Sequence, residues 1–192
     1  MRLISVVFIL SLMVVSTHAY ARKTKSNVYC TGQVARVLDG DTVIVKCHSS
    51  AGEKRIRIAE IDTPETSKRN KACFGMPYGD VATNAAKEVL LGRTVDVVGH
   101  NKDRYGRLVA KLFVNVMDYA RYMVKHGYAH VYSHYARDKQ LKQLGRLAKQ
   151  EKVGIWSLPR QCQMYPPKWR RIHNTSERCS IQKKWRLLGC PW

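Results

Sequence analysis

Three short β-rich runs follow one another between positions 33 and 61. VARVL and TVIV flank the pair Asp39-Gly40, which is typical of a hairpin turn with a positive φ angle. The third run, RIRIAEI (55–61), alternates charged and apolar residues as a half-buried strand does, and it stops before Pro64. The pattern predicts three consecutive strands, the first two joined as a hairpin.

The rest of the chain adds two strands and three helices to this unit. Asp80 can cap a helix over 81–91 that Gly92 closes. Strands are expected at 94–98 and 107–114, and further helices at 116–126 and 138–152. Five short strands with an inserted helix favour an α+β fold, a five-stranded OB-type β-barrel with about three helices. Such a fold does not define a function.

The first residues are typical of a secretory signal peptide. A basic start, an apolar run over 3–15 and small residues up to Ala19 predict a signal peptide over 1–19, although cleavage could follow Ala21. The alternative is a permanent anchor, but a membrane helix needs roughly 20 apolar residues. No other stretch could cross a membrane, so we expect a secreted protein, extracellular or periplasmic.

Six cysteines remain after removal of the signal, which favours three disulfides and an oxidising compartment. Cys30 and Cys47 lie near each other across the first hairpin, and we expect them to pair. Cys73 and the three cysteines of the C-terminal segment (Cys162, Cys179, Cys190) would then form two further bridges.

The segment 158–192 differs from the rest in composition. It is basic, rich in proline and tryptophan, and has little periodicity, so we expect an irregular extension pinned by disulfides. It either staples the barrel or docks on a polyanion.

The formal net charge of +20, from 34 Lys and Arg against 14 Asp and Glu, attracts polyanions. Nucleic acid, anionic glycans and cell surfaces all fit this charge, which alone does not choose among them.

Carboxylates gather at the ends of the predicted strands. Asp39 and Asp41 flank the first turn, and Asp62 and Glu65 follow the third strand. Arg57 lies two residues inside that strand, on the face opposite Ile56 and Ile58. Carboxylate oxygens suit Ca²⁺ or Mg²⁺, and arginines suit phosphate. Taken singly, each residue has a plainer reading as a turn, loop or solvated strand residue.

Five segments together resemble the staphylococcal nuclease family. They are LDGDTV (38–43), RIRIAEIDTPET (55–66), DRYGRL (103–108), KHGYAHVY (125–132) and EKVGIWS (151–157). They occur in the family's order and at about its spacing, which predicts a nuclease-like domain over 30–157.

The resemblance implies roles for the clustered residues. Asp41 and Asp62 would bind Ca²⁺ through their carboxylates and Thr63 through its backbone carbonyl, with Asp39 in the outer shell. Glu65 would act as the general base or orient the attacking water. Arg57 and Arg107 would hold the scissile phosphate.

The nucleotide pocket is less complete. Arg104 and Tyr105 match pocket positions of the family. Its second pocket tyrosine is replaced by Ser133, so either Tyr132 or Tyr135 is expected to take its place.

His126, His130 and His134 recur every four residues, but Gly127 interrupts that helix. We therefore expect surface or nucleic-acid contacts for these histidines, and not a metal site.

The resemblance therefore implies a secreted, Ca²⁺-dependent nuclease that hydrolyses DNA and RNA and leaves 3′-phosphate products. The chain is expected to be a monomer without an obligate protein partner. The alternative is a non-catalytic module that binds nucleic acid, but binding alone does not need the retained acids.

Overall fold

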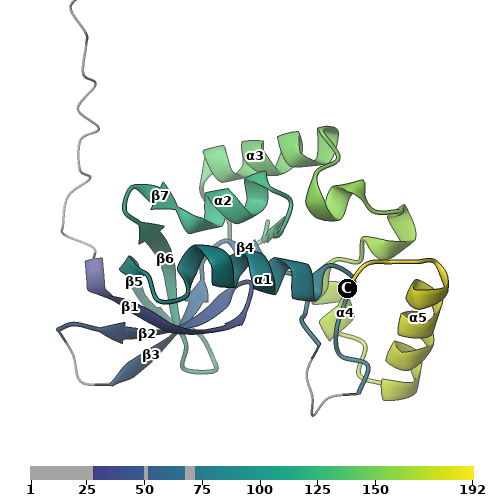
Figure 1. Cartoon of the computed structure of the whole chain (residues 1–192), viewed down its shortest axis with the longest axis horizontal. Coiled ribbons are helices and arrows are strands. Elements are labelled where there is room, and N and C mark those ends of the chain that lie inside the picture. The colour runs from purple at the N-terminus through teal and green to yellow at the C-terminus, as the bar shows by residue number, and fades with distance from the viewer. Residues whose placement is uncertain (1–27, 50–51, 68–71) are drawn as a thin grey trace, which may run out of the picture.

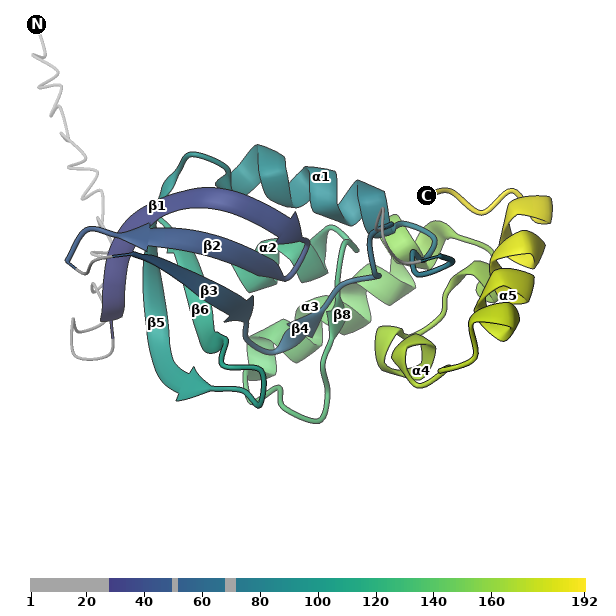
Figure 2. The same cartoon turned by 90° about the horizontal axis from the view of Figure 1, so that it is seen from below.

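A computed structural model describes residues 28–49, 52–67 and 72–192 (Figures 1 and 2). The predicted signal peptide lies outside these residues. Five strands form a closed mixed barrel: β1 (Val28–Asp39), β2 (Thr42–Cys47), β3 (Glu53–Ile58), β5 (Thr94–Lys102) and β6 (Leu108–Val114). The strand order is β3-β2-β1-β5-β6, with the two-residue β7 (Met117–Asp118) beyond β6. A parallel pairing of β3 with β6 closes the barrel, which confirms the predicted fold class.

The first hairpin forms as expected, but its glycine is needed for a different reason. Asp39 pairs with Thr42 across the turn. Gly40 does not have a positive φ angle, so that expectation was wrong. A Cβ atom at Gly40 would lie 2.7 Å from Cγ2 of Thr63, and the close approach of these two segments requires glycine.

The third predicted strand is split in two. Ile56 and Ile58 are buried while Arg55 is exposed, so the predicted alternation is confirmed. However, β3 ends at Ile58, and Glu60 turns the chain with a φ angle of 66°. The following β4 (Ile61–Asp62) leaves the barrel to pair with β8 (His130–Val131). Asp62 therefore lies in a small second sheet beside the barrel.

Three helices follow where the sequence predicts them: α1 (Gly79–Leu90), α2 (Tyr119–Lys125) and α3 (Lys139–Gln150). The N-cap of α1 is Tyr78, not Asp80 as predicted. Asp80 lies in the first turn, where it accepts hydrogen bonds from the Thr66 hydroxyl and the Ser67 backbone. It is thereby drawn to the segment that follows Glu65. Gly92, with a φ angle of 74°, closes the helix as expected.

The main hydrophobic core lies between the barrel and the helices. It joins barrel residues such as Val34, Ile56 and Leu112 to Leu90 of α1 and Met123 of α2. In both views α1 runs alongside the barrel, while α2 and α3 lie next to each other (Figures 1 and 2). Among the described residues no helix is both long and apolar enough to cross a membrane.

The C-terminal extension is helical, so the expectation of an irregular tail was wrong. After the short helices η2 (Gly154–Ser157) and η3 (Arg160–Cys162) come α4 (Pro166–Arg170) and α5 (Thr175–Leu187). Both views place α4 and α5 at one end of the molecule, beyond the barrel (Figures 1 and 2). Proline in the first turn of α4 and the N-cap Asn174 of α5 favour these helices locally.

A second, smaller core holds the extension to the nuclease-like domain. Trp169 and Trp185 bury their rings 5.0 Å apart, and Met76 from the segment before α1 packs among them. Three disulfides join Cys30 to Cys47, Cys73 to Cys179 and Cys162 to Cys190. The expected pairing is confirmed: one bond lies within the barrel, one within the extension, and one links the two.

Candidate active site

Two buried carboxylates form the centre of the site. Asp41 lies in the β1–β2 turn, and its Oδ2 accepts a hydrogen bond of 3.0 Å from the Thr63 backbone. Its Oδ1 accepts another, also of 3.0 Å, from the Thr42 hydroxyl. Asp62 lies in β4 with a side chain that is 0% exposed. The turn of the first hairpin and the end of β4 therefore meet at these two acids.

Arg57 joins both acids through a single nitrogen. Its Nη2 lies 3.4 Å from Oδ2 of Asp41 and 3.2 Å from Oδ1 of Asp62. The β2–β3 register pairs Arg57 with Thr42, next to Asp41. The carbonyl oxygen of Ile58 accepts a hydrogen bond of 2.5 Å from Nη1, which fixes the guanidinium. The acids expected from separate strand ends thus converge on one point.

Arg107, the residue before β6, borders the same cluster. Its Nη1 donates a 3.5 Å hydrogen bond to the Thr42 hydroxyl, which in turn donates to Asp41. Nε and Nη2 each lie 2.7 Å from Oδ2 of Asp103. Asp103 therefore orients Arg107 and leaves Nη1 turned toward the acids.

The two remaining acids, Asp39 and Glu65, lie beside this pair. Asp39 accepts a hydrogen bond of 3.1 Å from the backbone nitrogen of Asp41. Glu65 is largely buried and lies 2.8 Å from Nη1 of Arg170, a residue of the extension. Arg170 also pairs with Asp62, so the same guanidinium joins Glu65 to the buried acids.

Burial and the repulsion between neighbouring carboxylates give Asp39, Asp41 and Asp62 different pKa values. Burial, with the neighbouring Asp41 and Glu65 charges, raises the pKa of Asp39 to about 7. Burial also favours a raised pKa at Asp41, but Arg57 and the Thr63 N–H outweigh it and lower that pKa. Burial raises the pKa of Asp62 to about 6 against the opposing effect of Arg170. Asp41 is thus the acid most firmly held as a carboxylate.

The predicted nucleotide-pocket residues form two groups beside the acids. Nη2 of Arg104 donates a 2.7 Å hydrogen bond to the Tyr105 hydroxyl, and Tyr105 is 68% exposed. The Arg107 guanidinium lies 5.6 Å from the centroid of the Tyr105 ring, which connects this group to the site. Tyr132 and Tyr135 contact each other edge to face at 4.9 Å.

The extension supplies two site residues that the sequence reasoning missed. Arg170 contacts two of the acids. Tyr165 lies near Ser133, and the nearby Asp62 and Tyr132 contribute, after burial, to the raised pKa of Tyr165. Tyr165 therefore comes close to the position where the family pattern has a second tyrosine. Neither residue lies in a segment that resembles the family, so no sequence signal identifies them.

The three spaced histidines do not share a helix face. His126 caps the end of α2, and Gly127, with a φ angle of 67°, ends the helical path as expected. His130 lies in β8, buried between the rings of Trp156 and Tyr165. The expected surface or nucleic-acid contact is therefore wrong for His130. Burial lowers the pKa of His130 to about 3.

The small closed five-stranded barrel with its helices defines the class of OB-type proteins. The family described as "Staphylococcal nuclease homologue" matches residues 55–158. An endonuclease of Escherichia coli O157:H7, described as uncharacterised, is 38% identical over 66% of this chain and 76% of its own. A micrococcal nuclease of Shigella flexneri is 29% identical over 73% of this chain and 80% of its own. A thermonuclease of Staphylococcus intermedius is 31% identical over 64% of this chain and 74% of its own.

The chain therefore belongs to the staphylococcal nuclease family. The resemblance stated from the five sequence segments is confirmed, and nuclease homologues point to endonuclease activity on nucleic acid.

Proposed function

We propose that this protein is an exported, Ca²⁺-dependent nuclease that hydrolyses phosphodiester bonds of DNA and RNA, leaves 3′-phosphate products and acts as a monomer. The observation that carries the proposal is the convergence of Asp41 and Asp62 on one nitrogen of Arg57, with Glu65 alongside. A cluster of buried acids has no use in simple polyanion binding, because it repels phosphate unless a cation covers it.

The donors at this site fit a hard cation. Asp41 and Asp62 present carboxylate oxygens toward each other, and Thr63 is adjacent to both. No group of three or more His, Cys, Asp or Glu side chains in the described ranges is arranged as a metal cluster. A site of two carboxylates completed by a backbone carbonyl and water suits Ca²⁺ or Mg²⁺ chemistry. Bound there, Ca²⁺ would neutralise phosphoryl charge and acidify water.

The protein's own side chains have distinct roles in the rest of the reaction. Glu65 accepts the proton of the attacking water or orients that water. Arg57 and Arg107 donate hydrogen bonds to the phosphoryl oxygens, whose charge grows during the displacement. Asp103 holds Arg107 in place for this role. Arg104 and Tyr105, with Tyr132 or Tyr135, bind the neighbouring nucleotide through hydrogen bonds and stacking.

Export is supported by the three disulfides, which persist in oxidising compartments. The signal peptide that would direct it is a prediction from the sequence. N-terminal sequencing of the protein recovered from outside the cytoplasm tests it, and the expected first residue follows Ala19 or Ala21.

Digestion of labelled single-stranded DNA and of RNA, each with Ca²⁺ and with a chelator, tests the activity. We expect cleavage of both substrates only with Ca²⁺, and end-group analysis should find 3′-phosphates. Glu65→Gln should slow cleavage by about 10²- to 10⁴-fold through loss of the proton acceptor, and Asp41→Asn should abolish it. Asp96→Asn is the matched control, because Asp96 bonds Thr31 on a different part of the barrel.

The same digestions, run on gels, distinguish the nuclease from the alternative, a non-catalytic binding module. A protein that retards the labelled strand but leaves it intact in Ca²⁺ would exclude the nuclease. Full activity of Asp41→Asn, or of the wild type in chelator, would exclude the proposed metal role.

A further inference from the structure

Arg170, the last residue of α4, reaches from the extension into the acid cluster. Its Nη2 lies 2.5 Å from Oδ2 of Asp62, and its Nη1 lies 3.1 Å from Oδ1 of the same carboxylate. Nη1 also lies 2.8 Å from Oε1 of Glu65. One guanidinium thus engages both oxygens of Asp62 and one of Glu65. Paired hydrogen bonds of this kind are among the strongest that a carboxylate accepts.

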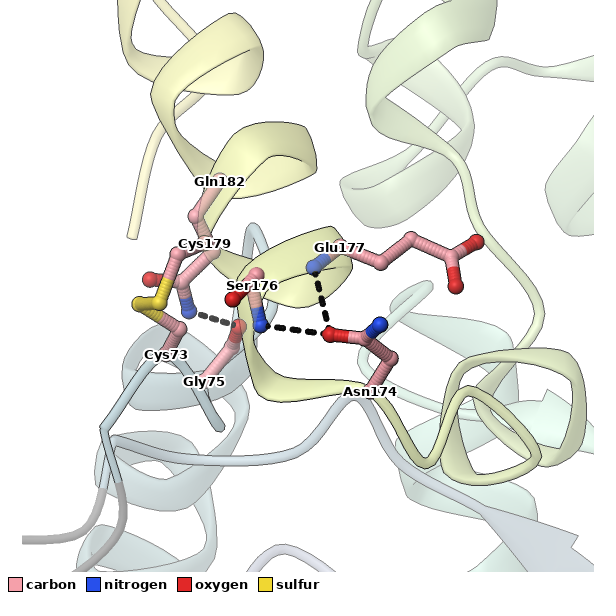
Figure 3. Close-up of a disulfide and its surroundings, with 7 residues drawn as sticks. All are labelled: Cys73, Gly75, Asn174, Ser176, Glu177, Cys179 and Gln182. Carbon is pink, nitrogen blue, oxygen red and sulfur yellow. Dashed lines mark hydrogen bonds between the residues drawn. A yellow bond between two sulfur atoms is a disulfide. The ribbon is translucent and has the colours of Figure 1, made fainter.

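The extension is attached to the nuclease-like domain at a position from which the Arg170 side chain reaches the acids. The Cys73–Cys179 disulfide ties α5 to the segment that follows Glu65, and Gln182 donates a 2.6 Å hydrogen bond to the Gly75 carbonyl (Figure 3). Next to Arg170, the indole of the fully buried Trp169 donates a 2.7 Å hydrogen bond to the Phe74 carbonyl. These contacts grip the short stretch 73–75 from two helices.

The start of α5 is fixed as well. Asn174 caps it by accepting hydrogen bonds from the backbones of Ser176 and Glu177, as Figure 3 shows. One turn further on, Arg178 donates a hydrogen bond of 3.4 Å to the carbonyl oxygen of Arg170. The corner between α4 and α5 therefore sets the position from which the Arg170 side chain extends.

Arg170 differs from Arg57 in what it occupies. Arg57 contacts one oxygen from each of two acids and bonds to a backbone carbonyl, so it leaves Oδ2 of Asp62 free of its own contacts. Arg170 takes that oxygen and shares the other. Its side chain is 37% exposed, compared with 12% for Arg57, so Arg170 is the less enclosed of the two.

We propose that Arg170 is an internal cation that occupies Asp62 and Glu65 when no divalent ion is bound, and that it must leave Asp62 before an ion can bind. The proposal rests on the proposed function, because the same Asp62 oxygens are assigned there to Ca²⁺. A guanidinium that pairs with both oxygens of Asp62 lies where a divalent ion would approach the same carboxylate, and the two cations repel each other. The extension thereby lowers the affinity of the site for the metal.

Titration calorimetry of Ca²⁺ into the full-length protein, without nucleic acid, measures this competition. Arg170→Met keeps the aliphatic length and removes the guanidinium. We expect it to bind Ca²⁺ roughly tenfold more tightly than the wild type, within the usual range of coupling between two ligands. Arg170→Lys, a cation that cannot pair with both oxygens in parallel, should give an intermediate affinity.

Arg171→Met is the matched control. Arg171 is the exposed neighbour of Arg170, so the two variants carry the same net charge, while the control keeps the contacts of Arg170 with the acids. Its Ca²⁺ affinity should equal that of the wild type. An equal gain in both variants would mean that the effect is general electrostatics, which overturns the proposal.

Because Arg170 and Ca²⁺ weaken each other's binding equally, the effect of Ca²⁺ on the unmodified protein gives a second readout. If Ca²⁺ displaces Arg170, saturating Ca²⁺ should speed hydrogen exchange in α4, although ligands normally protect a protein. Unchanged or weaker Ca²⁺ binding by Arg170→Met, with a wild-type melting temperature in chelator, would show that Arg170 supports the metal site and would overturn the proposal. In that case Ca²⁺-dependent cleavage by the wild type leaves the proposed function standing. Absence of Ca²⁺ binding in every variant overturns both.

Discussion

At the scale of single residues, the site depends on close packing between the first hairpin and the end of β4. The Gly40 Cα faces the Thr63 side chain, and the Gly40 carbonyl accepts a 2.7 Å hydrogen bond from the buried Tyr119 hydroxyl. Asp41 follows directly and bonds the Thr63 backbone. A substitution at Gly40 therefore shifts the acids, although their own side chains are unaltered.

Gly40→Ala should lower both stability and nuclease activity. Its new Cβ would lie 2.7 Å from Cγ2 of Thr63, and overpacking of a buried contact costs about 1–3 kcal/mol. Urea unfolding and digestion of single-stranded DNA measure the two effects. Thr63→Ser removes that methyl group but keeps Cβ and Oγ1, each 3.0 Å from the new atom, so the double variant should recover part of both losses. If Gly40→Ala matches the wild type, or the serine gives no recovery, steric pressure from Thr63 is not the reason for this glycine.

Residue identity explains why the acids could be predicted from the sequence and Arg170 could not. Asp41, Arg57, Asp62 and Glu65 stand at strand ends within segments that resemble a known family, so chemistry and spacing agree on them. Arg170 belongs to a segment without such a resemblance, and its position depends on long-range contacts with Phe74 and Cys73 through its neighbours. A contact that spans about 100 residues leaves no local pattern.

At the scale of elements, an ion-pair network fastens the β3–β4 turn to the start of α3. Lys111 of β6 lies 2.9 Å from Glu60 and 3.5 Å from Asp138, the N-cap of α3. Glu60 accepts a 3.0 Å hydrogen bond from the Asp138 backbone, and Arg121 of α2 lies 2.8 Å from the Asp138 carboxylate. The network connects both helices to the turn that leads to Asp62.

The network predicts an acid-sensitive contribution to stability. Burial would raise the pKa of Asp138, but its hydrogen bonds to Arg121 and the α3 backbone lower it from 3.8 to about 2. The unfolded chain therefore takes up this proton first, so the stabilisation is complete above the unfolded pKa and is lost as the pH falls through the folded pKa. The full conversion of this shift, about 2 kcal/mol, is an upper bound, because solvent screens this partly exposed carboxylate.

Asp138→Asn tests this contribution, because asparagine keeps the helix cap and removes the charge. Urea unfolding should find the variant less stable than the wild type at pH 7, and the difference should shrink between pH 4 and pH 2. Asp96→Asn should show no such pH-dependent difference. A gap between Asp138→Asn and the wild type that is constant with pH would mean that the charge of Asp138 contributes nothing.

Most strands and helices formed where local sequence patterns predict them, although two local rules failed, the positive φ angle at Gly40 and the N-cap at Asp80. The alternation in β3 and the closing Gly92 of α1 were predicted correctly. The break at Ile58 was not, because Glu60 adopts a positive φ angle that its contacts with Lys111 and the α3 backbone stabilise. The helices α4 and α5 were missed since their apolar residues, Trp169 and Trp185, bury against each other and Met76 and not along one regular stripe.

At the scale of the whole molecule, the extension is part of the structure that surrounds the site. Its core buries Met76, its disulfide to Cys73 closes a loop of 106 residues, and its helix α4 ends at the acids. Of its exposed cations, Lys168 lies on α4 two residues before Arg170. We therefore expect this surface to contact nucleic acid that enters the site, and not only to stabilise the barrel.

The salt dependence of binding tests that expectation. Each phosphate contact with a single strand contributes about 0.7 to the slope of log affinity against log salt concentration. Lys168→Gln should therefore lower the slope by about 0.7 in fluorescence anisotropy on a labelled single strand in chelator, where cleavage is absent. Lys46→Gln is the control, because exposed Lys46 lies near the end of β2 opposite the acid turn and should leave the slope unchanged. Equal slopes for Lys168→Gln and wild type would confine the extension to holding the fold and placing Arg170. Equal losses in both variants would mean that the strand responds to net charge and not to α4.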